Sequence, residues 1–84
     1  MLKLGWQNSN QKAMNQINPA KLLNSKWTAR SPENKEKHFL VTKVEFAEDG
    51  SIVSCLIEAV LTKRGRVIDW QELKDSDRWA IGWQ

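Results

Sequence analysis

The chain of 84 residues lacks the features on which several protein classes depend. Its single cysteine, Cys55, cannot form an internal disulfide, and no cluster of Cys and His offers the ligands of a zinc site. No apolar run reaches the ~18 residues of a transmembrane helix, and Met1 to Gln16 lack the apolar core and the cleavage site of a secretory signal. We therefore expect a cytoplasmic protein with no membrane association, no bound metal and no cofactor.

Motifs for catalysis are also missing. The four glycines are scattered along the chain, which excludes a glycine-rich phosphate loop. A metal site needs several ligands and catalysis needs a base beside a nucleophile, and neither pattern surrounds His38, the only histidine. Cys55 falls on the predicted core face of a strand, where a thiol acts as a small apolar side chain. We predict that the protein is not an enzyme, because an enzyme would need a pocket that joins His38 to a carboxylate.

Tryptophan is abundant although the other aromatic residues are scarce. The chain has five tryptophans, two phenylalanines and no tyrosine. Each tryptophan can bury about 150–250 Å², and a chain this short needs such side chains in its core. We predict that Trp27, Trp70 and Trp79 are buried, whereas Trp6 and Trp83 are more exposed.

Charge is distributed unevenly along the chain, whose net charge is +3. Residues 1–43 hold eight Lys and Arg against two Glu, a net charge of +6, and residues 44–84 hold five against eight acidic residues, a net charge of −3. A positively charged half is typical of proteins with anionic partners. Folding can bring the two halves together, so this pattern alone is a weak indication.

Two linked β-hairpins are predicted in the centre of the chain. Lys37 to Phe46 and Ser51 to Thr62 have the composition of strands, and Asp49-Gly50 suits a type I′ turn between them. Arg64-Gly65 forms a second turn, after which Arg66 to Trp70 returns as an antiparallel strand.

The two turns agree on which face of the sheet is buried. They place Val44 opposite Cys55 and Ile68 opposite Leu61. The predicted core face comprises His38, Leu40, Thr42, Val44, Phe46, Val53, Cys55, Ile57, Ala59, Leu61, Ile68 and Trp70. The opposite face then carries an apolar patch of Phe39, Val41, Leu56 and Val60, which a monomer does not normally leave bare.

Shorter elements precede the hairpins. Asn18-Pro19 starts a helix of about two turns, because Asn caps the first amides and Pro needs no hydrogen-bond donor there. Lys26 to Ala29 is a short strand, and Arg30 to Glu36 is a polar loop.

Two further elements follow the hairpins. Asp69 and Glu72 have the spacing of a capping box, which predicts a helical turn over Trp70 to Asp75. Arg78 to Trp83 alternates large apolar residues with small ones and forms the last strand.

This order of elements predicts a mainly β protein. A small antiparallel meander sheet curls into an SH3-like barrel, with one short N-terminal helix and a helical turn before the last strand. The alternative is an open, curled antiparallel sheet covered by the short helix. Residues 1–17, rich in Asn, Gln and Ser, form a flexible N-terminal segment, and residues 18–84 form a single small β domain.

Several short motifs resemble those of a known family. They are Asn18-Pro19-Ala20-Lys21-Leu22-Leu23, Ser25-Lys26-Trp27-Thr28-Ala29, Lys37-His38-Phe39, Glu58-Ala59-Val60-Leu61-Thr62, Trp70-Gln71-Glu72-Leu73-Lys74-Asp75, Trp79 and Gly82-Trp83. On these motifs the chain is similar to a small tryptophan-rich family of bacterial proteins whose function is uncharacterised. The resemblance implies a bacterial origin and one small domain, and it implies no reaction, ligand or partner.

Charge and aromatic content together predict a small binding module. A basic hairpin turn beside exposed tryptophan suits single-stranded nucleic acid, whose bases stack on aromatic rings while cations neutralise its phosphates. The candidate ligand-binding residues are Lys26, Arg30, Lys63, Arg64, Arg66 and Trp83. The alternative is a protein-interaction or self-associating, dimeric module that uses the outer apolar face of the sheet.

Overall fold

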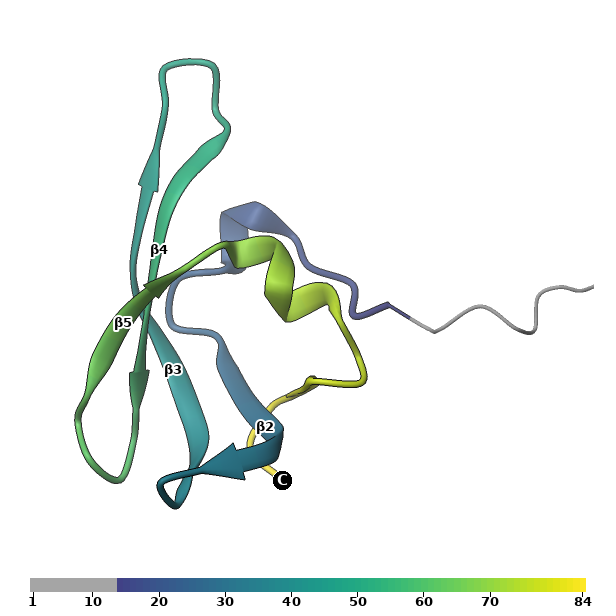
Figure 1. Cartoon of the computed structure of the whole chain (residues 1–84). Coiled ribbons are helices and arrows are strands. Elements are labelled where there is room, and N and C mark those ends of the chain that lie inside the picture. The colour runs from purple at the N-terminus through teal and green to yellow at the C-terminus, as the bar shows by residue number, and fades with distance from the viewer. Residues whose placement is uncertain (1–13) are drawn as a thin grey trace, which may run out of the picture.

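The computed structural model describes residues 14–84, which contain one five-stranded antiparallel sheet (Figure 1). The strands are β2 (Lys26–Glu33), β3 (Glu36–Phe46), β4 (Ile52–Ala59), β5 (Gly65–Ile68) and β6 (Trp79–Ile81). The only helices in this part of the chain are two short 3-10 helices, η1 (Pro19–Lys21) and η2 (Trp70–Lys74). The order β5-β4-β3-β2-β6 makes a four-stranded meander whose first strand also pairs with β6.

The mainly β prediction is confirmed, but the sheet does not close into the predicted SH3-like barrel. β5 and β6 lie at its two edges and are not paired with each other. These strands have only four and three residues, so little backbone is available at the edges for a closing ladder. The sheet is open, as in the alternative fold. No helix within residues 14–84 is long and apolar enough to cross a membrane.

The N-terminal helix is a single 3-10 turn and is therefore shorter than predicted. Its capping signal is confirmed, because the Asn18 side chain accepts a hydrogen bond from Ala20 N at 3.0 Å. The turn nevertheless ends at Lys21. Asn24, with a φ of 69°, donates its N–H to Val41 O of β3 at 2.8 Å, which directs the chain into the sheet before a second helical turn forms.

The helical turn predicted before the last strand is present as η2. Asp69 is its N-cap, and its side chain accepts a hydrogen bond from Gln71 N at 3.0 Å. The helix buries Leu73 completely, so this local capping signal positions a core residue.

The predicted loop over Arg30 to Glu36 is wrong. β2 continues to Glu33, which lies opposite Glu36, and a two-residue turn joins β2 to β3. The turn residues Asn34 and Lys35 have φ values of 56° and 62°, the positive values that a type I′ turn requires. Lysine occupies the position where glycine usually signals such a turn, and this hid the hairpin from sequence analysis.

The turn between β3 and β4 also differs from the prediction. Gly50, with a φ of 88°, is the only residue of this turn with a positive φ, so Asp49-Gly50 is not a type I′ turn. A turn of three residues closed by a left-handed glycine fits the structure instead. Phe46 consequently lies opposite Ile52 rather than Val53.

An extra residue, Thr42, interrupts the pairing of β3 with β4. Val44 lies opposite Cys55 as predicted, but on the other side of this bulge Val41 lies opposite Ile57, one residue out of the predicted register. A shift of one residue exchanges the two faces of a strand. The first half of β3 therefore turns toward the core the side chains that we expected on the outside.

The predicted outer apolar patch is divided by this shift. Phe39 and Val41 are buried in the core, whereas Leu56 and Val60 are half-buried. Residues predicted in the core that are instead exposed or half-buried are His38, Leu40, Thr42, Val44, Phe46, Val53, Leu61 and Trp70.

The turn after β4 is longer than the two residues predicted. Lys63 has a φ of 64° and donates its N–H to Ala59 O at 2.8 Å. Ile68 therefore lies opposite Cys55 instead of Leu61. It is nevertheless buried, as the prediction for the core face requires.

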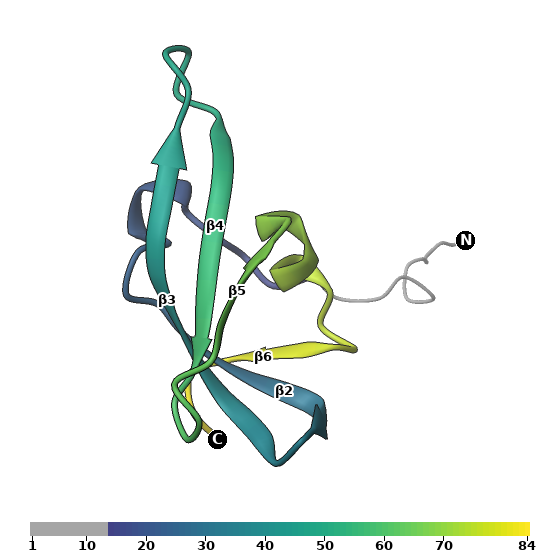
Figure 2. The same cartoon turned by 60° about the vertical axis from the view of Figure 1, so that its left-hand side comes forward.

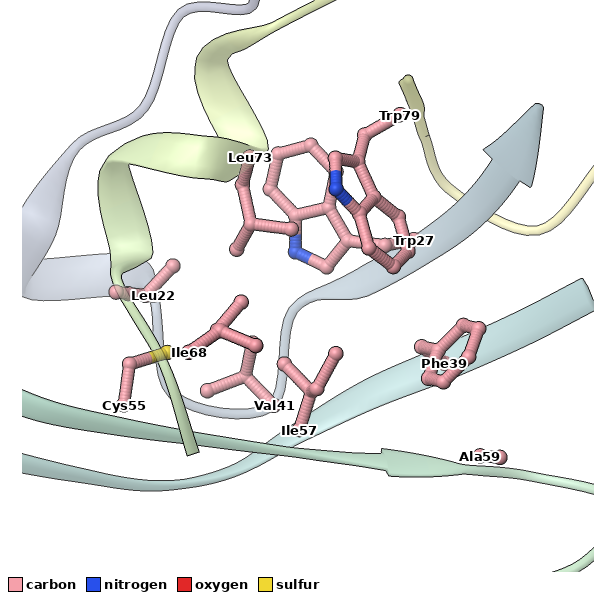
Figure 3. Packing of buried hydrophobic residues seen from close by; sticks show 10 residues of the cluster. All are labelled: Leu22, Trp27, Phe39, Val41, Cys55, Ile57, Ala59, Ile68, Leu73 and Trp79. Carbon is pink, nitrogen blue, oxygen red and sulfur yellow. The ribbon is translucent and has the colours of Figure 1, made fainter. Parts of the chain in front are cut away.

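The core lies on one face of the sheet, where η2 and the segment that follows η1 cover it (Figure 3). It draws residues from every strand, namely Leu22, Trp27, Phe39, Val41, Cys55, Ile57, Ala59, Ile68, Leu73 and Trp79. Phe39 and Trp79 meet edge to face, with ring centroids 5.2 Å apart. The burial of Trp27 and Trp79 confirms the prediction for these two residues, and Trp70 packs half-buried against the core.

Residues 14–17, which we assigned to the N-terminal segment, contact the rest of the chain. The Asn15 side-chain amide donates hydrogen bonds to Leu73 O at 2.8 Å and to Trp79 O at 2.9 Å. It thereby joins η2 to β6, and Ile17 packs against the core. Trp6 and the rest of residues 1–13 lie outside the described residues.

Two adjacent leucines differ in burial and test which residues form the core. Leu22 is 1% exposed and Leu23 is 50% exposed. We expect Leu22→Ala to lower the free energy of unfolding by about 2–5 kcal/mol through lost burial and a cavity, and Leu23→Ala to change it by about 0.5 kcal/mol or less. Urea denaturation followed by tryptophan fluorescence measures both, and equal losses would contradict the assigned core.

Candidate ligand-binding surface

The chain reverses direction after β6 at Gly82, whose φ is 80°. Gly82 N donates to Lys26 O at 2.8 Å, and the buried Thr28 hydroxyl donates to Gly82 O at 2.6 Å. The same hydroxyl oxygen accepts from Gln84 N at 2.9 Å. Lys26 and Thr28 flank the core residue Trp27 in β2, so these bonds attach the last residues to the outer face of the sheet.

Trp83 is held on this outer face with 44% of its surface exposed. Its indole Nε1 donates to Phe39 O at 2.9 Å. Lys26 Nζ lies 4.8 Å from the ring centroid, within cation–π distance. The His38 ring lies 6.2 Å away at an angle of 46°, and its Nε2 is 2.8 Å from Gln84 O. We refer to Lys26, His38 and Trp83 as the aromatic patch.

More positive charge adjoins the aromatic patch. A shallow cleft of about 370 Å³ is lined in part by Thr28, Arg30, Lys37 and Gln84. Arg30 Nε donates to Ser76 O at 2.6 Å, which fixes the position of its guanidinium. Because Thr28 and Gln84 also support the aromatic patch, the cleft continues that surface.

A second cleft, of about 500 Å³, lies where the β2–β3 hairpin, the β4–β5 turn and the segment before β6 meet. We refer to it as the arginine cleft. Core residue Trp79 forms part of its wall. Its charged lining residues are Glu33, Glu36, Arg64, Arg66, Asp77 and Arg78, so its formal charges balance.

Glu36 sets the electrostatics of the arginine cleft. Its carboxylate accepts a hydrogen bond from the Thr62 hydroxyl, and Arg64 donates to it from Nε at 3.0 Å and from Nη2 at 3.3 Å. The Thr62 hydrogen bond is the main cause that lowers the pKa of Glu36, and Arg64 and Arg66 lower it further although partial burial opposes them. Part of the Arg64 charge is therefore already neutralised within the protein.

The structure divides the predicted site residues between these surfaces. Val60 N of the β4–β5 turn donates to His38 O at 2.9 Å, so this turn lies between the aromatic patch and the arginine cleft. Lys26, Arg30 and Trp83 lie on the patch and its adjoining cleft, Arg64 and Arg66 line the arginine cleft, and Lys63 is exposed on the turn.

Glu36 and His38 were not among the residues predicted for these surfaces. Glu36 fell in a predicted loop, and its partners Thr62 and Arg64 are 26 and 28 residues away in sequence. His38 was expected on the core face, and the bulge at Thr42 turns it outward. A recognised turn at residues 34–35 is the one local signal that would have placed Glu36 in a strand.

Other reactive side chains do not join either surface. Cys55 is buried, and burial raises the pKa of its thiol. No group of three or more His, Cys, Asp or Glu side chains converges within residues 14–84 to hold a metal ion.

The chain matches one known protein family. The model of a tryptophan-rich protein family, DUF2389, matches residues 25–84. The chain belongs to this family. The DUF2389 region contains all five strands, the aromatic patch and the arginine cleft, and it begins after η1. Searches of curated proteins and of solved structures found no match.

The Glu36 contacts predict a pH dependence of stability. Because the folded-state pKa of Glu36 lies below its ordinary value of 4.5, the stabilisation is complete above that value and is lost as the pH falls through the lowered pKa. Glu36→Gln should be less stable than the wild type at neutral pH, and this difference should shrink on acidification. The midpoint of urea unfolding measures it at each pH.

Glu33→Gln is the matched control, because Glu33 is the exposed residue opposite Glu36 in the hairpin. Its unfolding midpoint should follow that of the wild type across the same pH range. A constant difference between Glu36→Gln and the wild type at all pH values would contradict the assigned contacts.

Proposed function

We propose that this DUF2389 protein is a non-enzymatic binding module that binds single-stranded nucleic acid on the aromatic patch. The observation that carries the proposal is Trp83, a large aromatic ring that is almost half exposed yet fixed by a hydrogen bond to the backbone of β3. A ring that is already ordered loses little conformational entropy when a base stacks on it.

The hydrogen bonding of Trp83 favours stacking over base-edge recognition. Its only donor, Nε1–H, is used by Phe39 O, so the ring offers a base its π face and no hydrogen bond. Stacking on an aromatic ring contributes about 1–3 kcal/mol per base and depends little on sequence. We therefore expect binding with weak sequence preference.

Positive charge around the patch supports an anionic ligand. Lys26, Arg30 and Lys37 lie on the patch or its adjoining cleft, and Lys63 is on the neighbouring turn. Arg64 is the weakest of the predicted contacts, because Glu36 already neutralises part of its charge. The basic turn of the sequence-based hypothesis thus contributes chiefly through Lys63.

The non-enzymatic part of the proposal rests on the surroundings of the two reactive side chains. His38 Nε2 lies 2.8 Å from the main-chain oxygen of Gln84, and the His38 ring faces Trp83 rather than a nucleophilic side chain. Cys55 is buried under apolar neighbours. Neither side chain has the exposed base–nucleophile geometry that catalysis needs.

A matched pair of lysines tests the proposal. Lys26 and Lys74 make the same contact with different rings, with Nζ 4.8 Å from the Trp83 centroid and 4.7 Å from the Trp70 centroid. We expect Lys26→Ala to weaken binding of a fluorescein-labelled oligothymidylate in anisotropy titrations and to reduce the salt slope by about 0.7, the value for one phosphate contact on a single strand. Lys74→Ala should bind as the wild type does.

Replacement of the ring gives a second measurement. Trp83→Leu should weaken the same binding by about 5- to 150-fold, the equivalent of one lost stacking interaction. Absence of oligonucleotide binding at low salt would refute the proposal, and so would equal effects of Lys26→Ala and Lys74→Ala.

A further inference from the structure

The distal part of the β3–β4 hairpin, Val44 to Ser54, projects as an arm beyond the rest of the sheet (Figures 1 and 2). The pairing explains the projection. β2 pairs with β3 no further than Leu40, and β5 pairs with β4 no further than Cys55. The two strands of the arm therefore have only each other as neighbours in the sheet.

Two apolar side chains of the arm are exposed rather than packed on the core. Phe46 is 52% exposed and Val53 is 64% exposed. Val44 and Ile52 of the same arm do pack against the core, so the arm needs neither Phe46 nor Val53 for its attachment. Exposed apolar side chains on a projection are typical of contact surfaces.

The charge of the arm is wholly acidic. Glu45, Glu48 and Asp49 are its charged residues, and residues 44–54 contain no Lys or Arg. Glu45 has a partner at the base of the arm, Lys43, with Nζ 3.5 Å from its carboxylate. The tip residues Glu48 and Asp49 are exposed to solvent.

The opposite end of the sheet is basic and aromatic. The residues that follow β6, the β4–β5 turn and the β2–β3 hairpin lie at the end remote from the arm (Figures 1 and 2). These segments carry the aromatic patch together with Lys37 and Lys63. The arm cannot reach this end of its own chain, and only a second copy can bring the two surfaces together.

We propose that the arm of one copy docks on the aromatic patch of a second copy. Phe46 and Val53 would cover Trp83, and the acidic tip would face Lys26 and its neighbouring cations. Arm-to-arm pairing is disfavoured because it would bring together surfaces of the same negative charge. The docking joins different surfaces of the two copies, so it forms a closed assembly where the rotation between copies closes and an open chain where it does not.

This docking rests on the proposed function for one consequence only. If the aromatic patch also binds single-stranded nucleic acid, the acidic, aromatic arm competes for the same stacking ring and the same cations. Nucleic acid would then dissociate the assembly, so that self-association and ligand binding exclude each other.

Sedimentation equilibrium of the full chain over a wide concentration range tests the docking. We expect the average mass to rise above that of the monomer as the concentration increases and to fall as salt is added. Lys26→Ala and Val53→Ser should each weaken association, the latter about tenfold or more because a buried valine becomes polar. Val67→Ser is the matched control, because Val67 is 68% exposed on β5, outside the arm, and it should associate as the wild type does.

Several outcomes would overturn the docking. They are a monomer at every concentration, a closed dimer that salt does not weaken, and a Val67→Ser variant as impaired as Val53→Ser. Circular dichroism of each variant shows whether it is folded. Glu48→Lys changes only the charge of the exposed tip and no core residue, so it is a second variant of the arm that tests the docking without affecting the core.

Addition of oligothymidylate separates this proposal from the proposed function. Dissociation of the assembly by the oligonucleotide supports both. Association that depends on Lys26 and Val53 without any oligonucleotide binding supports the docking and refutes the proposed function. Oligonucleotide binding by a protein that stays monomeric refutes the docking alone, and an assembly that persists when saturated with oligonucleotide refutes docking on the aromatic patch.

Discussion

One extra residue in β3 decides what each face of the sheet presents. The bulge at Thr42 turns Phe39 and Val41 into the core and leaves His38 on the outside, next to Trp83. The bulge has a local cost, because the buried Thr42 hydroxyl has no hydrogen-bond partner among the described residues. Burial of such an unpaired hydroxyl costs about 1–3 kcal/mol. The same bulge accompanies the burial of Phe39 and Val41, which contributes about 1.5–3 kcal/mol for each side chain relative to its exposure to water.

Local signals in the sequence predicted much of the fold. Asn18 and Asp69 cap the helices that they were expected to cap, since capping depends only on residues a few positions away. The register of β3 was beyond such reasoning. Its segment from His38 to Phe46 is apolar on both faces, so alternation cannot tell which set is buried, and a bulge leaves no mark in the composition. The order of the elements was therefore predictable and the open sheet was one of the two predicted alternatives, whereas the exchange of faces was not predictable.

The candidate site depends on contacts that are distant in sequence. Exposure of Trp83 was predictable, but its neighbours were not, because Lys26 and His38 meet it only after β6 has paired with β2. Arg64 appeared in sequence as part of a freely available basic turn. Arg64 pairs with Glu36 because the β2–β3 hairpin places Glu36 in a strand. The turn of that hairpin has Lys35 at the position where glycine is usual, so the sequence did not reveal it. Charge counts along a chain do not distinguish a cation that is available to a ligand from one that is already neutralised.

The reversal at Gly82 places the aromatic ring by backbone conformation and not by packing. A Cβ atom added at Gly82 would meet no other atom within 4 Å, and yet the φ of 80° is one that side chains rarely permit. The requirement at this position is therefore torsional, and asparagine, which accepts left-handed backbone more readily than other residues, is the least disruptive replacement. Larger or branched residues would favour an extended backbone there, and the chain would continue along the line of β6 and carry the indole off the outer face. The orientation of the whole aromatic patch is thus governed by one main-chain angle in a region with room to spare.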